Sequence, residues 1–284
     1  MNRPQPTMSY LRLTRPANLL IAGISVGVGA AVSHCASAET VCPAIASAIL
    51  IAAGGNAIND FFDRETDRVG KGNRPIPSGQ VTAGGSVLFA GLLFLLGWVL
   101  SFRVGNGGFA LVTCWVVLLV LYSSHLKRTG FAGNVVVSGV SASAFVLGGF
   151  AGLDPLRSLI PAVLAFLFHL GREIIKDVQD ERGDAKAGVR SLAVQLGSEK
   201  ALAIAAVVFG VLVGATLLPF ALGYYNAIYL VMVIIGVDLP LVYVMIAILS
   251  GPSERRLGML SGLLKIDMLV GIVCILIGSG IPGT

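Results

Sequence analysis

The sequence predicts an all-α protein that crosses the membrane nine times and forms a single domain over residues 1–284. Hydrophobic residues make up 55% of the chain and charged residues only 12%, and the mean hydropathy of +0.86 is far above that of a water-soluble domain. A helix needs about 20 apolar residues to cross a hydrocarbon core about 30 Å thick. Such stretches recur from Ala17 to the end of the chain, so we expect a polytopic membrane protein.

Nine apolar segments are separated by charged or turn-forming residues, and each is expected to form one helix. These segments are 16–34, 41–60, 84–102, 108–123, 132–151, 157–177, 199–219, 223–249 and 258–280. The first lacks a small-residue cleavage site, which favours a retained membrane helix over a signal peptide. The uncharged run Ala201–Val237 is too long for one crossing, and Pro219 and the turn at Gly223–Asn226 are the expected break.

The basic residues predict the orientation, because short loops rich in Lys and Arg stay in the cytoplasm. With a cytoplasmic N-terminus, 18 of the 20 Lys and Arg residues lie on the inner side, and only Arg103 and Arg157 lie outside. The net charge of +5 is then explained by the orientation of the protein among the membrane lipids. No nucleic-acid partner is expected. The cysteines form no CxxC pair and the histidines are scattered, so neither a zinc site nor a redox dithiol is predicted.

Amide and carboxylate side chains gather where the second predicted helix leaves the membrane. They are Asn56, Asn59, Asp60, Asp63 and Asp67. On a continuing helix they fall within an arc of about 100°, and such oxygen donors suit Mg²⁺. The alternative is a solvated helix end whose acids pair with Arg64 and Arg68.

A second cluster follows the sixth predicted helix and repeats the same spacing. Asp177, Asp180 and Asp184 are separated by three and then four residues, as are Asp60, Asp63 and Asp67. Four predicted helices lie between the clusters, an even number, so both emerge on the same face of the membrane. Together they predict a site for more than one divalent ion.

Basic and polar side chains accompany these carboxylates on the predicted inner face. They are Arg74, Tyr122, Lys127, Arg128, Asn134, Arg172 and Lys176. A diphosphate needs such a mixture, because metal ions bridge some of its oxygens while Arg and Lys neutralise the others. For Lys127 and Arg128, simple anchoring of the topology is an equally good interpretation.

These motifs resemble those of the UbiA family of intramembrane prenyltransferases. The first family motif, NDxxDxxxD, matches Asn59, Asp60, Asp63 and Asp67, and the second, DxxDxxxD, matches Asp177, Asp180 and Asp184. The strings LTRPANLL, NRPIPSG and YSSHLK extend the resemblance over nearly the whole chain. The resemblance implies nine helices around a central cavity, Mg²⁺ as the cofactor and an isoprenyl diphosphate as the donor.

The resemblance also implies roles for individual residues. Catalytic roles fall to Asp60, Asp63, Asp67, Asp177, Asp180 and Asp184. Metal binding falls to Asn59, Asp63, Asp67, Asp177, Asp180 and Asp184. Binding of diphosphate or phosphate falls to Asn59, Arg74, Tyr122, Lys127, Arg172 and Lys176. The segment GREIIKDVQDERGDAKAGVRSLAVQLG is most similar to the archaeal branch, in which a geranylgeranyl group is transferred to the sn-2 hydroxyl of a lipid-like glyceryl phosphate acceptor.

Three other interpretations remain open at this point. An aromatic acceptor, a quinone or haem precursor, is the alternative within the family. A transporter would carry ionisable groups along a path at the midplane, and Asp238 is the one acid expected well inside a predicted span. Phosphotransferases that act on CDP-linked head groups also use paired aspartates, but they require glycine where Arg64 follows Asp63.

Overall fold

The protein is described by a computed structural model that covers residues 6–35, 37–70, 72–186 and 188–280. Within these ranges the chain is helical and contains one isolated β-bridge, between Cys35 and Gly152. The α-helices are α1 (Pro6–Thr14), α2 (Pro16–Val32), α3 (Ala38–Phe62), α4 (Arg64–Gly70), α5 (Ala83–Ser101), α6 (Gly105–Ser124), α7 (Phe131–Ala142), α8 (Ala144–Phe150), α9 (Leu159–Lys186), α10 (Leu192–Leu196), α11 (Ser198–Thr216), α12 (Leu218–Ala221), α13 (Ala227–Val233), α14 (Leu239–Leu249) and α15 (Glu254–Gly278).

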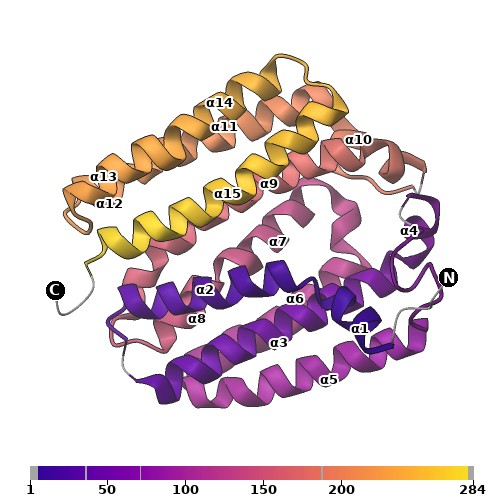
Figure 1. Ribbon diagram of the computed structural model, residues 1–284, viewed down its shortest axis with the longest axis horizontal. Coiled ribbons are helices and arrows are strands. Elements are labelled where there is room, and N and C mark those ends of the chain that lie inside the picture. The colour runs from indigo at the N-terminus through magenta and orange to yellow at the C-terminus, as the bar shows by residue number, and fades with distance from the viewer. Residues whose placement is uncertain (1–5, 36, 71, 187, 281–284) are drawn as a thin grey trace.

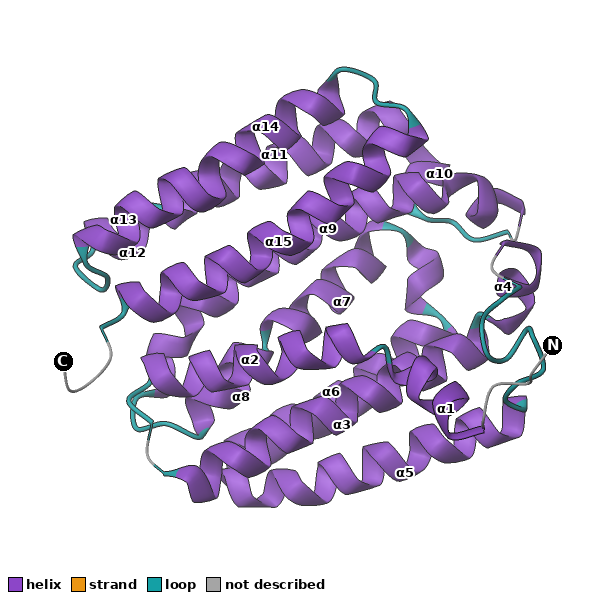
Figure 2. Cartoon of the chain, in the orientation of Figure 1, coloured by secondary structure: helices purple, strands orange, loops and turns teal. Residues whose placement is uncertain are grey.

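The long helices lie side by side in two groups that follow the order of the chain. Helices α2, α3, α5 and α6 form one group, and α9, α11, α14 and α15 form the other (Figure 1). Each group has its own cluster of buried apolar side chains. Figure 2 shows that most loops lie at the two ends of the bundle. The short helices α4 and α10 lie together at one of these ends.

Two glycines allow close contact between α8 and the C-terminal half of α2. A Cβ atom added to Gly148 would lie 2.0 Å from the carbonyl oxygen of Val26, and one added to Gly29 would lie 2.1 Å from that of Phe145. Helices in membranes use small residues in this way, because close backbone approach increases van der Waals contact. The α2–α8 contact therefore requires glycine at both positions.

Seven helical stretches in the described residues are long and apolar enough to cross a membrane, and α1 with α2, bent by 49°, could form an eighth. One of the seven, Ala83–Ser124, contains both α5 and α6. Trp98 Nε1 donates to Thr113 Oγ1 over 2.9 Å, although a straight helix would separate these residues by about 22 Å. The chain therefore reverses at Gly105, where φ is +85°.

The helix boundaries confirm some details predicted from the sequence and add others. The expected break between the seventh and eighth segments is present, since α12 ends at Ala221 and the side chain of Asn226 caps α13. The fifth predicted segment is broken at Ser143 into α7 and α8. A π-helical turn, Ile234–Asp238, joins α13 to α14.

Candidate active site

A pocket of about 800 Å³ opens at the end of the bundle where α4, α10 and the end of α9 meet. Helix α4 contacts α9 directly, so the two acidic clusters lie together despite their separation in sequence. The predicted site residues that line this pocket are Asn59, Asp63, Asp67, Arg74, Tyr122, Lys127, Lys176, Asp177, Asp180 and Asp184. Asn134 and Arg128, from the third predicted inner loop, also line it.

The first cluster differs from the predicted single helical face. Helix α3 ends at Phe62 and α4 begins at Arg64, with Asp63 between them. Asn59 Nδ2 donates to Asp63 Oδ2 over 2.8 Å at the pocket, whereas Asn56 Nδ2 donates to the carbonyl oxygen of Thr14 over 2.8 Å. An arc of about 100° is wide enough to face two neighbours. The polar face is therefore divided between the pocket and the junction of α1 with α2.

Asp60 belongs to the part of this face that points away from the pocket. Its side chain is buried, with 4% of the residue exposed, and it does not line the pocket. Arg15 Nη2 donates to Asp60 Oδ1, and Arg74 Nη1 lies 3.3 Å from the same oxygen. Asp60 therefore contacts two arginines, which contrasts with the catalytic role that the family motif implies for it.

Arg74 and Lys127 neutralise the two remaining aspartates of the first cluster. Arg74 Nη1 donates to Asp67 Oδ2 over 2.6 Å, and Lys127 Nζ donates to Asp63 Oδ2 over 2.5 Å. Burial raises the pKa of Asp67 above its usual value, and the positive charge of Arg74 partly opposes that increase. The Lys127 contact joins two predicted inner loops, so this lysine does more than anchor the topology.

The second cluster is held by hydrogen bonds from two other elements. Asp177 Oδ2 accepts from Asn134 Nδ2 over 2.9 Å and from the backbone nitrogen of Leu192 over 3.1 Å. Lys176 Nζ donates to Glu173 Oε2 over 2.8 Å. Asp177 Oδ1 takes no hydrogen bond from the described residues, so it remains available to a ligand.

Arg172 differs from the other predicted phosphate-binding residues. It does not line the pocket. Its Nη1 lies 3.5 Å from Glu173 Oε1, and its buried Nε has no hydrogen-bond partner among the described residues. Arg172 precedes the acidic positions of α9 and lies one helical turn before Lys176, about 6 Å further along the helix axis from the end of α9 that lines the pocket.

The carboxylates form a suitable donor set for divalent ions, although no three His, Cys, Asp or Glu side chains in the described ranges already converge on one point. Asp63 and Asp67 bind Lys127 and Arg74 in this arrangement. The pocket nevertheless brings together five aspartates of the two motifs and the Asn59 amide, all hard oxygen donors of the kind that Mg²⁺ prefers.

Some pocket residues had no site role assigned to them from the sequence. They are Arg15, Arg64, Glu65, Glu173, Arg182 and Lys186. Arg15 was counted only as a topological charge, although its position just before Pro16 indicated a helix start near the inner face. The spacing of four residues places Glu173 beside Asp177 on the same helix, but no role of its own followed from the sequence.

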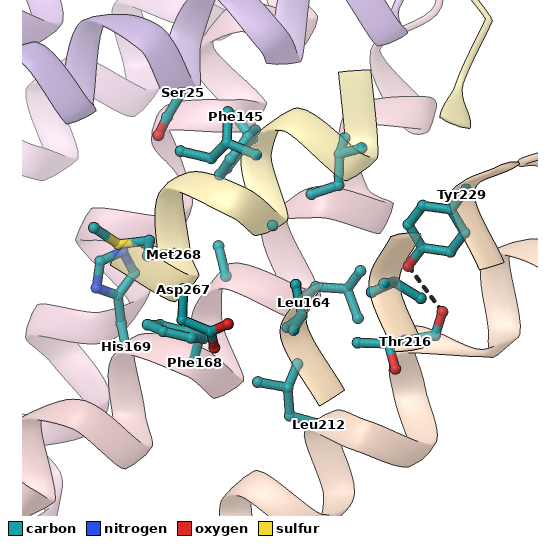
Figure 3. A pocket seen from close by; sticks show the side chains of 16 residues that line it. Ser25, Phe145, Leu164, Phe168, His169, Leu212, Thr216, Tyr229, Asp267 and Met268 are labelled. Carbon is teal, nitrogen blue, oxygen red and sulfur yellow. Dashed lines mark hydrogen bonds between the residues drawn. The ribbon is translucent and has the colours of Figure 1, made fainter. Parts of the chain in front are cut away.

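A second, smaller cavity of about 60 Å³ lies among α2, α8, α9, α11, α13 and α15 (Figure 3). Asp267 lines it with only 2% of the residue exposed, and neither carboxylate oxygen has a partner among the described residues. Thr216 Oγ1 lies 3.0 Å from Asp238 Oδ1, and Tyr229 Oη donates to the carbonyl oxygen of Thr216 over 2.8 Å. The expectation that Asp238 is the one acid well inside a span was wrong, because α15 buries Asp267 as well.

Known proteins are similar to this chain over most of its length. Residues 20–259 match the sequence model of the UbiA prenyltransferase family. A digeranylgeranylglyceryl phosphate synthase of Methanosphaera stadtmanae is 33% identical over 275 residues, which cover 95% of this chain and 98% of the relative.

Solved structures show the same fold. One, from work on digeranylgeranylglyceryl phosphate synthase in membranes, superposes with a TM-score of 0.80 at 30% identity. The superposition covers 96% of this chain and 98% of the chain in that structure. A UbiA homolog from Archaeoglobus fulgidus, bound to GPP and Mg²⁺, superposes with a TM-score of 0.69 at 21% identity. The superposition covers 94% of this chain and 99% of the homolog's chain.

Proposed function

Because this chain belongs to the UbiA prenyltransferase family, we propose that it transfers a geranylgeranyl group from geranylgeranyl diphosphate to the sn-2 hydroxyl of geranylgeranylglyceryl phosphate, a step in archaeal ether-lipid synthesis. The observation that carries this proposal is the single pocket lined by aspartates of both acidic clusters and by several of the predicted cations. The named relative, similar over almost its entire length, supports the choice of substrates.

Mg²⁺ is the proposed cofactor, held by Asn59, Asp63, Asp67, Asp177, Asp180 and Asp184. The oxygen donors of the pocket and the Mg²⁺ bound by the homolog from Archaeoglobus fulgidus support this assignment. When bound, Mg²⁺ neutralises diphosphate oxygens and so makes the diphosphate a better leaving group.

The residues of the pocket lower the barrier to breakage of the allylic C–O bond. Negative charge develops on the departing diphosphate, and Arg74, Lys127 and Lys176 are fixed cations that stabilise this charge as it forms. The acceptor hydroxyl then attacks the allylic carbon, its oxygen forms the new C–O bond, and its proton passes to a carboxylate or to the released diphosphate. Tyr122 lines the same pocket and helps to exclude water, which would otherwise capture the allylic cation.

The proposed topology has nine crossings around a central cavity, with residues 1–284 forming one domain. The reversal at Gly105 and the bent α1–α2 pair support this number. The bias of Lys and Arg places the N-terminus and the loops of the pocket in the cytoplasm. Both lipid substrates would then reach the pocket from the surrounding membrane.

The test is to incubate the purified protein with geranylgeranyl diphosphate and a panel of acceptors, and to identify the products by mass spectrometry. We expect Mg²⁺-dependent prenylation of the glyceryl phosphate acceptor. A preference for a quinone or haem precursor would instead support the aromatic alternative.

Variants of the two clusters test the site. Asp63→Ala and Asp180→Ala are each expected to lower kcat by about a hundredfold or more, because each removes part of the charge stabilisation around the diphosphate. Asp154→Ala is the control, since Asp154 pairs with Arg157 just before α9 and does not line the pocket. Unchanged turnover of the cluster variants at limiting Mg²⁺ would rule out their assigned roles.

A further inference from the structure

We infer that Arg15 binds a phosphate group in the large pocket, and that Asp60 positions Arg15 and Arg74 for this task and is not a metal ligand. This inference rests on the proposed function, and it assigns a role to Arg15, which lies outside both aspartate motifs. Four observations carry it: the backbone at Arg15, the burial of Asp60, the exposure of the two arginines, and the donor groups that remain available on them.

Arg15 occupies a special backbone position at the junction of α1 and α2. Its φ is +54° and its ψ is +70°, and among the described residues only Arg15 and His34 adopt a positive φ without being glycine. Residues with side chains adopt this left-handed conformation at a cost, and such positions concentrate at functional sites. The helix axis turns by 49° here, and the turn directs the Arg15 side chain to the pocket.

Asp60 lies behind the two arginines and does not contact the pocket directly. Only 6% of its side chain is exposed, against 33% for Arg15 and 25% for Arg74. One oxygen, Oδ1, contacts both guanidinium groups, and the pocket is lined by the arginines but not by Asp60. The two arginines therefore lie between the buried Asp60 carboxylate and the pocket.

The two arginines keep donor groups for a ligand. A guanidinium group has five N–H donors, and the side-chain contact of Arg15 engages Nη2, while Arg74 uses Nη1 for both Asp60 and Asp67. The remaining N–H groups can bind two oxygens of a phosphate at once, which is the preferred geometry of arginine with this anion. A buried carboxylate behind them fixes the planes of both guanidinium groups.

The phosphate could belong to the donor diphosphate or to the acceptor, and steady-state kinetics distinguish these sources. Arg15→Gln is expected to raise KM for one substrate by about ten- to a hundredfold, the loss of hydrogen bonds to a charged group, and to leave the Mg²⁺ concentration for half-maximal rate within about twofold. Asp60→Asn should change the same KM in the same direction. Asp63→Asn is the contrasting variant, because it should raise the Mg²⁺ requirement.

Arg12→Gln is the matched control, because Arg12 is an exposed arginine one turn earlier that contacts Gln80 and the carbonyl oxygen of Asn73. It should leave both KM values unchanged. Arg15→Lys, which keeps the charge but not the paired donors, should recover only part of the affinity, and thermal unfolding verifies that each variant is folded.

Direct binding separates this inference from the proposed function. Inorganic diphosphate and glycerol phosphate, each titrated into the purified protein with Mg²⁺ in a calorimeter, should bind the wild type more tightly than Arg15→Gln. If the wild type fails to turn over the lipid substrates, the proposed function falls while the binding difference still supports Arg15. If Arg15→Gln changes neither affinity nor KM, or if Asp60→Asn raises the Mg²⁺ requirement as much as Asp63→Asn, the inference is wrong.

Discussion

Asp177 illustrates how a single side chain can serve both structure and ligand binding. Its Oδ2 accepts hydrogen bonds from Asn134 on α7 and from the backbone of Leu192 at the start of α10. These contacts fix the carboxylate plane from two sides, while Oδ1 stays available. The residues that orient a metal ligand contribute to metal affinity without touching the ion.

Asn134→Ala is therefore expected to raise the Mg²⁺ concentration for half-maximal activity by about ten- to a hundredfold, because it frees the Asp177 carboxylate to rotate. Mg²⁺ titrations of the initial rate measure this effect. Ser138→Ala, one turn along α7 and buried, is the control. An unchanged Mg²⁺ requirement in Asn134→Ala would show that Leu192 alone holds Asp177.

The sequence predicted many of the polar residues that line the pocket, but not their contacts. Asp63, Asp67 and the second cluster were identified from spacing alone, because helical periodicity places residues three and four positions apart on one face. Asp60 lies apart from the pocket because it pairs with Arg15, which is 45 residues earlier in the chain. Helical periodicity gives the direction of a side chain on its own helix, whereas the neighbour that it meets is decided by tertiary packing.

At the scale of the helix, small residues decide how closely elements approach. The α2–α8 contact leaves no room for a Cβ atom at Gly148 or Gly29. Close packing here keeps α7 and α8 in place against α2 and α9, and α7 carries Asn134 into the pocket. The break between α7 and α8 at Ser143 was not predicted, because no proline or charge marks it in the sequence.

Gly148→Ala is expected to destabilise the protein by about 1–3 kcal/mol, since the added methyl group must displace the α2 backbone. Thermal unfolding in detergent measures the change. The control is Gly139→Ala on α7, where an added Cβ meets no atom within 4 Å. Equal melting temperatures for the two variants would contradict the close packing described here.

At the scale of the whole molecule, α4, which contributes residues to the pocket, lies at one end of the bundle, and α2 ends at the other (Figure 1). Helix α1 begins at the pocket end, and α15 ends at the opposite one. The apolar segments and their order could be predicted because bilayer thickness sets the length of a crossing. The division into two groups of helices follows from contacts between distant segments, which hydropathy does not encode.

This arrangement predicts which cysteines are reactive from each side of the membrane. A variant that retains only Cys35, an exposed residue before α3, should react with an impermeant maleimide in intact cells. A variant whose only cysteine is Ser78→Cys, an exposed position at the pocket end, should react only after permeabilisation. The reverse pattern would overturn the proposed orientation.

The location of the pocket at one end has a consequence for the growth of the membrane. An enzyme whose chemistry takes place at a single surface releases every product molecule into the adjoining monolayer. That monolayer would expand while the opposite one did not, so the two would come under unequal lateral tension. Balanced growth therefore requires a separate flipping step that carries part of the new lipid to the other side.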